Sequence, residues 1–502
     1  MQSLKSLIGW LTNSHPLARI NRVPVLSFLV LILAFGFIET ARYSDHDLIK
    51  TIGVDAAPSV VLAQNIKSGV GRMFEDLNTE LDAKPGENYD LVKDFDATKV
   101  LVAANLTEAA HNITYTDDAD HLYPSEPQGE LGPVNRLQEG WAQFLMLAAK
   151  ARVFHENGDA AVLSTARDIN TVVNEVLLPS ADALSGVNDA HLQDKYASRV
   201  HHLIVGLGAA GVGIIFVLFM LYVQGILLTR TFKRGLNPFF AAATGLAFIF
   251  FAYCGYAFIN ANEDLYIAGT AAYPSVKVLT QTRADLLQAK AEASLWLLDR
   301  PNADQHQKAF DAYIDKIGKF GRGQTADTIN AIATHGYVKG GLGWSATTDG
   351  GPLKPDVLSG EIADELNNVT FPGELEGATK TVKVYADFLA LDKQVRSLEL
   401  QGQHAKAITL LAGGNPGQGN YLFDQLIDEK AKNGTLGSTY QINLAQQNAA
   451  IQRGFADIDN LEWLTPAILF LIQLLVFGGT LFVRSATSPE RAVARWRALS
   501  KA

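Results

Sequence analysis

Four long, uncharged apolar stretches constrain the fold more than any other feature of this sequence. They cover residues 23–38, 203–228, 238–259 and 463–483. An apolar helix of roughly 20 residues crosses a bilayer core about 30 Å thick, so each stretch predicts a transmembrane helix. None of the four contains Asp, Glu, Lys or Arg. Transport pathways usually need ionisable groups at membrane depth, so this composition argues against a transporter. Basic residues precede the first stretch, and a cleaved signal peptide ending near Ser44 is the alternative interpretation there.

The distribution of charge predicts an orientation. Segments 1–22, 229–237 and 484–502 together contain eleven Lys and Arg residues and one acid, Glu490. The long segments between the stretches are acidic, with 25 acids against 13 Lys and Arg in residues 41–200 and 25 against 18 in residues 260–462. Short basic segments stay in the cytoplasm, whereas large domains are translocated largely regardless of charge.

The resulting expectation is a multi-pass protein of a bacterial plasma membrane with both termini in the cytoplasm. Its expected parts are a cytoplasmic segment 1–22, transmembrane helices 23–40, 202–228, 238–259 and 463–483, a cytoplasmic link 229–237, extracytoplasmic domains 41–201 and 260–462, and a basic tail 484–502.

The two halves of the chain match at an offset of 216 residues. Ala57-Pro58-Ser59-Val60 corresponds to Tyr273-Pro274-Ser275-Val276, and a long helical pattern follows each tetrapeptide. The apolar stretches that precede them align at the same offset. The sequence therefore predicts an internal repeat of span, outer domain and span.

Both long segments show the apolar spacing of helices. Helices are expected at residues 58–81, 133–154, 159–201, 276–298, 303–320, 379–401 and 438–461, with Pro179 as a kink. Glycine-rich segments at 335–355 and 413–419 are interpreted as loops, with ligand binding as the alternative. The expected fold class is an all-α membrane protein whose two extracytoplasmic up-down helical bundles form a tandem repeat.

This arrangement resembles the four-helix-bundle sensory domain of bacterial chemoreceptors and sensor kinases. The resemblance depends on the entry tetrapeptide with the helix at 64–82, on residues 177–188, on residues 274–299 and on Asn420-Tyr421-Leu422-Phe423-Asp424. The chain departs from chemoreceptors because it lacks a cytoplasmic coiled coil, a HAMP-like linker and a kinase. Its layout is similar to that of the GlnX-type membrane proteins of actinobacteria, which implies a relay from a solute-binding protein to a cytoplasmic kinase.

Most short motifs in this sequence do not indicate a chemical function at the positions where they occur. Gly206-x-Gly208-x-x-Gly211 matches a dinucleotide-binding pattern, but it lies inside an apolar stretch, where close packing against another helix or a lipid-facing surface explains it better. Asn105, Asn112, Asn368 and Asn433 occupy Asn-x-Ser/Thr sequons to which no role is assigned. The sequence contains no hydrolase elbow, metalloprotease motif or phosphate-binding loop, so an enzyme has no positive support.

One group of charged residues is a candidate ligand site. Arg283 and Lys290 fall on the seven-residue apolar seam of the helix at 276–298, and Lys67 aligns with Arg283 in the first half. A buried cation is costly unless it is paired. Its partner is either the carboxylate of a small anionic ligand or a protein acid in an internal ion pair, and a side chain reaching the rim is the further alternative.

The leading functional hypothesis is a non-catalytic transmembrane sensor that passes an extracytoplasmic signal to a cytoplasmic partner. A small anionic ligand or a solute-binding protein would supply the signal, and the lipid bilayer is the remaining partner. A homodimer is left open, and neither a cofactor, a metal nor a nucleic acid is expected. The alternative is a structural or assembly subunit of a cell-envelope complex.

Overall fold

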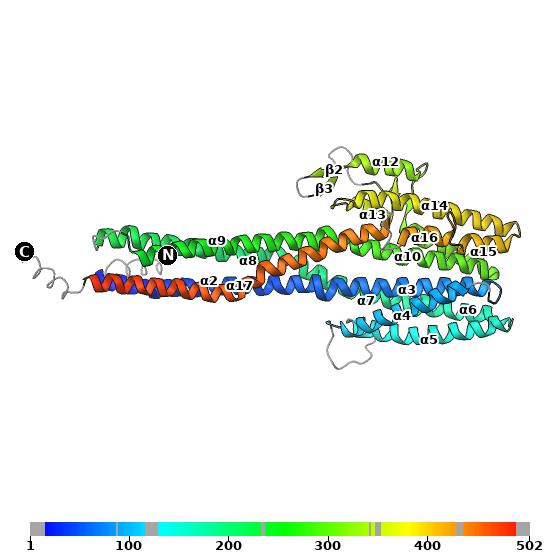
Figure 1. The fold of residues 1–502 in the computed structure, drawn as a ribbon, viewed down its shortest axis with the longest axis horizontal. Coiled ribbons are helices and arrows are strands. Elements are labelled where there is room, and N and C mark those ends of the chain that lie inside the picture. The colour runs from blue at the N-terminus through cyan, green and yellow to red at the C-terminus, as the bar shows by residue number, and fades with distance from the viewer. Residues whose placement is uncertain are drawn as a thin grey trace, which may run out of the picture. The chain divides into compact units, whose positions relative to one another are not determined.

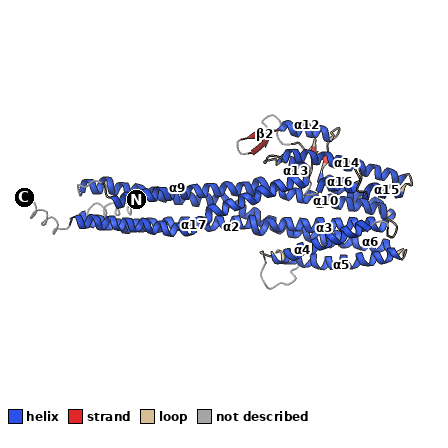
Figure 2. Cartoon of the chain, in the orientation of Figure 1, coloured by secondary structure: helices blue, strands red, loops and turns tan. Residues whose placement is uncertain are grey.

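The protein is almost entirely helical (Figures 1 and 2). The computed structural model describes residues 16–86, 89–115, 129–231, 236–340, 343–346, 353–427 and 435–487. The described residues separate into two compact units, each built from several chain segments. We call residues 1–50, 195–265 and 451–502 the span unit, and residues 51–194 and 266–450 the head unit.

The span unit contains the four apolar stretches, all of them helical. Its main elements are α2 (Pro16–Lys50), α8 (Arg199–Tyr222), the π-helix η3 (Val223–Thr231), α9 (Pro238–Tyr266) and α17 (Leu436–Thr487). They belong to four continuous helices of 64, 69, 61 and 50 residues that are long and apolar enough to cross a membrane. The predicted spans are therefore present as helices of suitable length and composition.

Small residues let the helices of the span unit approach closely. A Cβ atom added at Gly206 would lie 2.6 Å from Phe258 Cγ, and one at Gly213 would lie 2.1 Å from Phe251 Cγ, so α8 packs against α9 through glycines. Gly479 of α17 faces Phe240 of α9 in the same way. The packing interpretation of the glycine-rich stretch is confirmed for Gly206 and Gly213, as expected for helices that cannot gain from the hydrophobic effect in lipid.

The first half of the head unit, residues 51–194, is a set of long helices around a core that also includes Ala291 and Leu295 of the second half. Its elements are the π-helix η1 (Thr51–Asp55), α3 (Ala56–Asp82), α4 (Tyr89–His111), α5 (Leu131–Glu156), α6 (Ala161–Val172), the π-helix η2 (Val173–Leu177) and α7 (Leu178–Ala197). Phe74, Phe144 and Leu177 lie in this core.

The second half, residues 266–450, has a separate core that includes Phe310 and Phe388. Its helices are η4 (Ile267–Ala272), α10 (Tyr273–Leu298), η5 (Arg300–Asn302), α11 (Ala303–Ile317), α12 (Ala326–Gly336), α13 (Glu361–Asn367), α14 (Glu374–Leu400), α15 (His404–Ala412), α16 (Gly419–Ile427) and the first turns of α17. Its strands are β1 (Lys319–Phe320), β2 (Tyr337–Gly340), β3 (Gly343–Ala346) and β4 (Leu358–Ser359).

The strands correct the expectation of a purely helical chain. The helix predicted at 303–320 ends at Ile317, because Gly318 is extended and Lys319–Phe320 pair antiparallel with Leu358–Ser359. The segment 335–355, expected to be a loop, contributes the end of α12 and the antiparallel pair β2/β3, and residues 341–342 and 347–352 lie outside the described residues. The segments 1–15 and 488–502 also lie outside them.

Three prolines follow π-helical turns in otherwise continuous helices. Pro58 and Pro274 come shortly after η1 and η4, and Pro179 comes shortly after η2. Proline cannot donate the helical hydrogen bond, and its ring crowds the carbonyl of residue i−4. A local widening into a π-turn accommodates both effects without ending the helix. The π-turn η2 lies just before Pro179, where a kink was predicted, and η1 and η4 lie at the corresponding places before Pro58 and Pro274.

Candidate functional site

Helices α3 and α10 lie side by side in the head unit and carry the three residues of the predicted site. Lys67 contacts Asp285, Lys290 contacts Glu75, and the hydroxyl oxygens of Thr79 and Ser294 lie 3.2 Å apart. Residue numbers rise together along both helices, so the helices are parallel. The two halves of the head unit therefore meet along a helix pair with many polar contacts.

Lys67 forms a buried ion-pair group with acids from both halves. Its side chain is only 2% exposed, and its Nζ lies 3.1 Å from Asp182 Oδ1 and 3.1 Å from Asp285 Oδ1. Asp285 is fully buried and also pairs with Lys316 of α11. Protein carboxylates therefore balance the charge of Lys67, which corresponds to the internal ion-pair alternative of the sequence analysis.

Lys290 belongs to a second group further along the helix pair. Its Nζ lies 3.1 Å from Glu75 Oε1, donates a hydrogen bond to Asn420 Oδ1, and lies 4.9 Å from the centre of the Phe423 ring. Both Lys290 and Glu75 are buried. Lys290 is thus held by one acid, one amide and one aromatic ring, a combination that offsets much of the cost of burying a cation.

Arg283 is half-buried on α10, close in sequence to Asp285. The structure places Lys67 and Lys290 in separate ion-pair groups, so the three predicted residues do not converge on one anion pocket. Anion binding by Arg283 stays a prediction.

A small polar cavity opens beside Lys290. Its volume is about 50 Å³. It is lined by Arg72, Glu75, Asp76, Asp94, Leu287, Lys290, Asn420, Phe423, Asp424 and Ile427. These residues come from α3, α4, α10 and α16, so the cavity belongs to both halves of the head unit. Four of the lining side chains are acidic and two are basic, which makes the cavity acidic overall.

Asp76 is the least compensated acid of this cavity. Its side chain is buried, and among the described residues no donor forms a hydrogen bond with its Oδ2 atom. Burial, with the nearby charge of Glu75, raises the pKa of Asp76 well above its ordinary value, and Lys290 opposes that rise. An acid in this setting favours a proton or another cationic partner.

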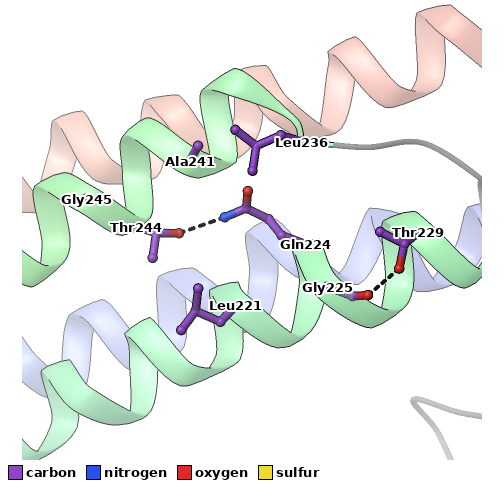
Figure 3. Close-up of a pocket in the computed structure, with 8 residues that line it drawn as sticks. All are labelled: Leu221, Gln224, Gly225, Thr229, Leu236, Ala241, Thr244 and Gly245. Atoms are coloured by element: carbon purple, nitrogen blue, oxygen red, sulfur yellow. Dashed lines mark hydrogen bonds between the residues drawn. The ribbon is translucent and has the colours of Figure 1, made fainter.

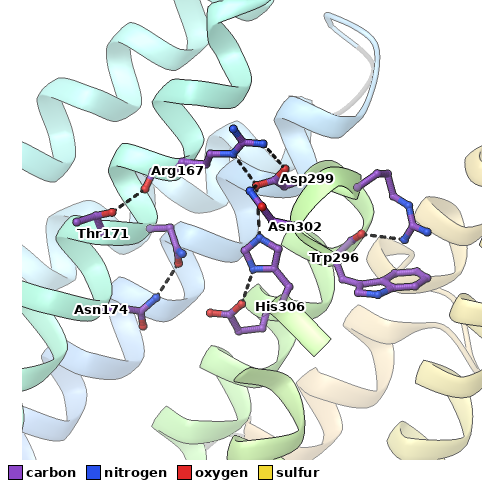
Figure 4. Close-up of polar contacts among 10 residues, drawn as sticks. Arg167, Thr171, Asn174, Trp296, Asp299, Asn302 and His306 are labelled. Carbon is purple, nitrogen blue, oxygen red and sulfur yellow. Dashed lines mark hydrogen bonds and ion pairs between the residues drawn. The ribbon is translucent and has the colours of Figure 1, made fainter. Parts of the chain in front are cut away.

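A further ionic contact joins the two halves near the ends of α6 and α10 (Figure 4). Arg167 donates two hydrogen bonds of 2.8 Å to the Asp299 carboxylate, and Asn302 donates a third. His306 lies between carboxylates, with its Nδ1 2.8 Å from Glu292 and its Nε2 3.6 Å from Asp299. The hydrogen bond from Arg167 lowers the pKa of Asp299 to about 2 against partial desolvation. The contact therefore stays ionic over nearly the whole pH range.

A hydrogen-bonded clamp, which the sequence analysis missed, holds the start of α3. Asn112 Nδ2 donates to Ser59 Oγ and to the Asp55 carbonyl at the end of η1. The buried Glu130 carboxylate accepts the backbone N–H groups of Thr114 and Tyr115. It also accepts a hydrogen bond from Asn188.

The second half contains the matching clamp at the start of α10. Asn368 donates to Ser275 Oγ and to the Ala271 carbonyl, and Glu374 accepts the backbone N–H groups of Thr370 and Phe371. Asp55 and Ala271, like Ser59 and Ser275, are separated by 216 residues. The signal was available in the sequence as Asn112-Ile113-Thr114-Tyr115 and Asn368-Val369-Thr370-Phe371, two of the sequons to which no role was assigned.

The span unit has a larger and more apolar cavity at the η3 end of α8 (Figure 3). Its volume is about 440 Å³ and its lining includes Leu221, Leu236, Ala241 and Gly245. Gln224 donates a hydrogen bond to Thr244 across its wall. The cavity has a mostly apolar lining and lies among the span helices. A lipid chain would therefore fill it, and no specific ligand is needed to explain it.

The fold and these contacts define a class: a helical protein with four helices able to cross a membrane and a polar head whose halves meet through buried ion pairs. Comparison with family models, with curated proteins and with solved structures finds no match to this chain. Its function has to be argued from its own residues.

Proposed function

We propose that this protein is a non-catalytic transmembrane sensor whose head unit lies outside a bacterial plasma membrane and relays a signal to a cytoplasmic partner. The observation that carries the proposal is the α3/α10 pair. Each of these helices continues a helix that contains an apolar stretch, within the continuous segments Arg19–Asp82 and Pro238–Leu298. A relative shift of α3 and α10 therefore has a covalent route toward the membrane.

The chemistry of the α3/α10 contact suits a part that changes its arrangement. Ion pairs such as Lys67–Asp285 and Lys290–Glu75 recover little more than their desolvation cost, so they hold the helices with a modest net free energy. Displacements of about 1–2 Å between packed helices are typical of signalling transitions. Such a shift would exchange one set of ionic partners for another.

The matching clamps support an origin of the head unit by internal duplication. Both halves anchor the helix that follows a π-turn by an Asn side chain and a buried Glu. A duplicated head gives two corresponding helices, α3 and α10, each of which continues into an apolar helix. This arrangement supplies within one chain the symmetry that sensors often obtain by dimerisation.

A disulfide lock tests the relay. In a Cys254→Ala background, Thr79→Cys and Ser294→Cys replace hydroxyls that lie 3.2 Å apart on α3 and α10. Oxidation should fix the helix pair, and hydrogen exchange of the full chain in nanodiscs should then change in the first turns of α2 and α9, at the far ends of the two continued helices. The single-cysteine variants are the controls. Unchanged exchange in a fully cross-linked protein would contradict the relay and favour a static assembly subunit.

The orientation has its own test. Leu236 is an exposed residue of the basic link 229–237, and Leu236→Cys in the same background should react with an impermeant thiol reagent only after the cells are opened. Labelling from intact cells would place the link outside and reverse the proposed orientation.

A further inference from the structure

The acidic cavity between α3 and α10 combines a free volume with a buried carboxyl group that lacks a hydrogen-bond donor among the described residues. Its volume of about 50 Å³ has room for roughly three or four water-sized groups. Lys290 already contacts Glu75 and Asn420, and Arg72 lies 3.6 Å from Asp94. Asp76 also lines the cavity, and among the described residues no donor forms a hydrogen bond with its buried Oδ2 atom.

We propose that this cavity binds a small primary ammonium group, with Asp76 as its anionic partner. The excess of carboxylates disfavours an anionic ligand. The proposed ligand is therefore a cation, whereas the sequence analysis expected an anion at Arg283 and Lys290. An ammonium group donates hydrogen bonds in several directions, as the Asp76 carboxylate requires. Leu287 and Ile427 accommodate a short alkyl group, while the Phe423 ring is already in contact with Lys290.

A metal ion fits the same cavity less well. Among the described residues, no group of three or more His, Cys, Asp or Glu side chains has an arrangement able to hold a metal. Divalent hard cations require six or more oxygen ligands or an ordered shell of waters, and two cationic side chains line this wall. A monovalent hydrogen-bond donor is therefore the better match.

The ligand would couple the two halves of the head unit. Asp76 belongs to α3, whereas Leu287 and Phe423 belong to α10 and α16. A ligand bound in the cavity would favour the arrangement of α3 and α10 in which the cavity exists. The size of this effect equals the difference in the ligand's binding free energy between the two arrangements. This consequence rests on the proposed function, because it names the class of ligand that the head would sense; binding itself does not depend on signalling.

Isothermal titration of the full chain in nanodiscs with methylammonium chloride tests the assignment directly. Sodium and potassium chloride at equal ionic strength are the references. Asp76→Asn keeps the side-chain shape but removes the charge, and it should weaken methylammonium binding by roughly tenfold or more. The matched control is Asp96→Asn, which removes an exposed charge on α4 that contacts Lys99 and does not line the cavity.

Protonation supplies a second signature. Because the pKa of Asp76 is raised, a proton competes with the ammonium group for its carboxylate. The charged residues that line the cavity with Asp76 are Arg72, Glu75, Asp94, Lys290 and Asp424. Binding should therefore tighten as pH rises from 5 to 8 in the wild type and lose this dependence in Asp76→Asn. Hydrogen exchange of the wild type should slow at residues 72–76 and 420–427 when methylammonium is added, a measurement that needs no variant.

Two results would overturn the assignment: methylammonium binding no stronger than that of sodium or potassium, or equal binding by the wild type and Asp76→Asn. If methylammonium binds and Asp76→Asn abolishes binding while the disulfide lock has no effect in the first turns of α2 and α9, the site stands and the relay fails. The two failures are thus distinguishable.

Discussion

The α8/α9 contact of the span unit and the α3/α10 contact of the head unit differ in their polar content. Gly206 and Gly213 let α8 approach the Phe258 and Phe251 rings of α9 so closely that a Cβ atom would not fit. The α3/α10 contact instead includes buried ion pairs such as Lys67–Asp285. Close packing fixes one arrangement, because any displacement loses dispersion contacts. Ion pairs can exchange partners, so their contact is the better candidate for a movable joint.

Removing one charge from the α3/α10 contact should have the largest effect. Lys67→Met leaves the buried Asp285 with Lys316 alone, and it should lower the free energy of unfolding by about 3–5 kcal/mol. Denaturant unfolding of the full chain in detergent measures this loss. Lys99→Met, which removes an exposed cation, should stay within about 1 kcal/mol of the wild type. The double variant Lys67→Met/Asp285→Leu should recover much of the loss, and a loss equal to the sum of two single changes would argue against a coupled pair.

Overpacking should break the α8/α9 contact. Gly213→Leu places side-chain atoms where the Phe251 ring lies and should cost about 1–3 kcal/mol in thermal or denaturant unfolding. Gly211→Leu is a matched control on the same helix, because a Cβ atom at Gly211 meets no described atom within 4 Å. Equal stability of the two variants would mean that α8 and α9 do not pack through this face.

The buried acid Glu365 should make head stability depend on pH. Burial, with the neighbouring Glu374, raises the pKa of Glu365 to about 8 from 4.5, and Ser275 opposes the rise. Because the folded state favours the protonated acid, stability falls as pH rises from about 4.5 through 8. Glu365→Gln should therefore match the wild type near pH 4 and exceed it near pH 6 by on the order of 2 kcal/mol, since each pH unit above 4.5 adds about 1.4 kcal/mol until the pH reaches 8. Melting temperatures at both pH values decide this, with the exposed Glu376→Gln expected to show no such difference.

The smallest effect is expected at the Arg167–Asp299 contact. The lowered pKa of Asp299, about 2 against an ordinary 3.8, means that its stabilisation is present above about pH 4 and is lost as pH falls toward 2. Because the Arg167 side chain is 44% exposed, Arg167→Met should cost only about 1 kcal/mol at pH 7. The difference from the wild type should shrink near pH 2. The exposed Arg322→Met serves as the reference, and a pH-independent difference would assign the loss to packing rather than to charge.

The span helices and the ion pairs also differ in how far the sequence could predict them. Whether a segment can cross a bilayer depends on its own length and composition, so the four spans could be predicted from the sequence alone. Apolar periodicity likewise predicted the helices that start near Pro58 and Pro274. The packing role of Gly206 and Gly213 could be stated only as an alternative, because the opposing Phe258 and Phe251 belong to another helix.

The sequence by itself placed Lys67 and Lys290 on the inward seams of two helices, because a seven-residue period depends only on neighbouring positions. Only the tertiary structure decided their partners. Asp285 lies 218 residues from Lys67, and Glu75 lies 215 residues from Lys290, so no local pattern could pair them. For the same reason the acidic cavity at Asp76, built from four helices of two halves, exists only once the chain has folded. The period of apolar residues determines which side of a helix is buried. Packing between segments that are distant in the sequence determines which residues contact that side.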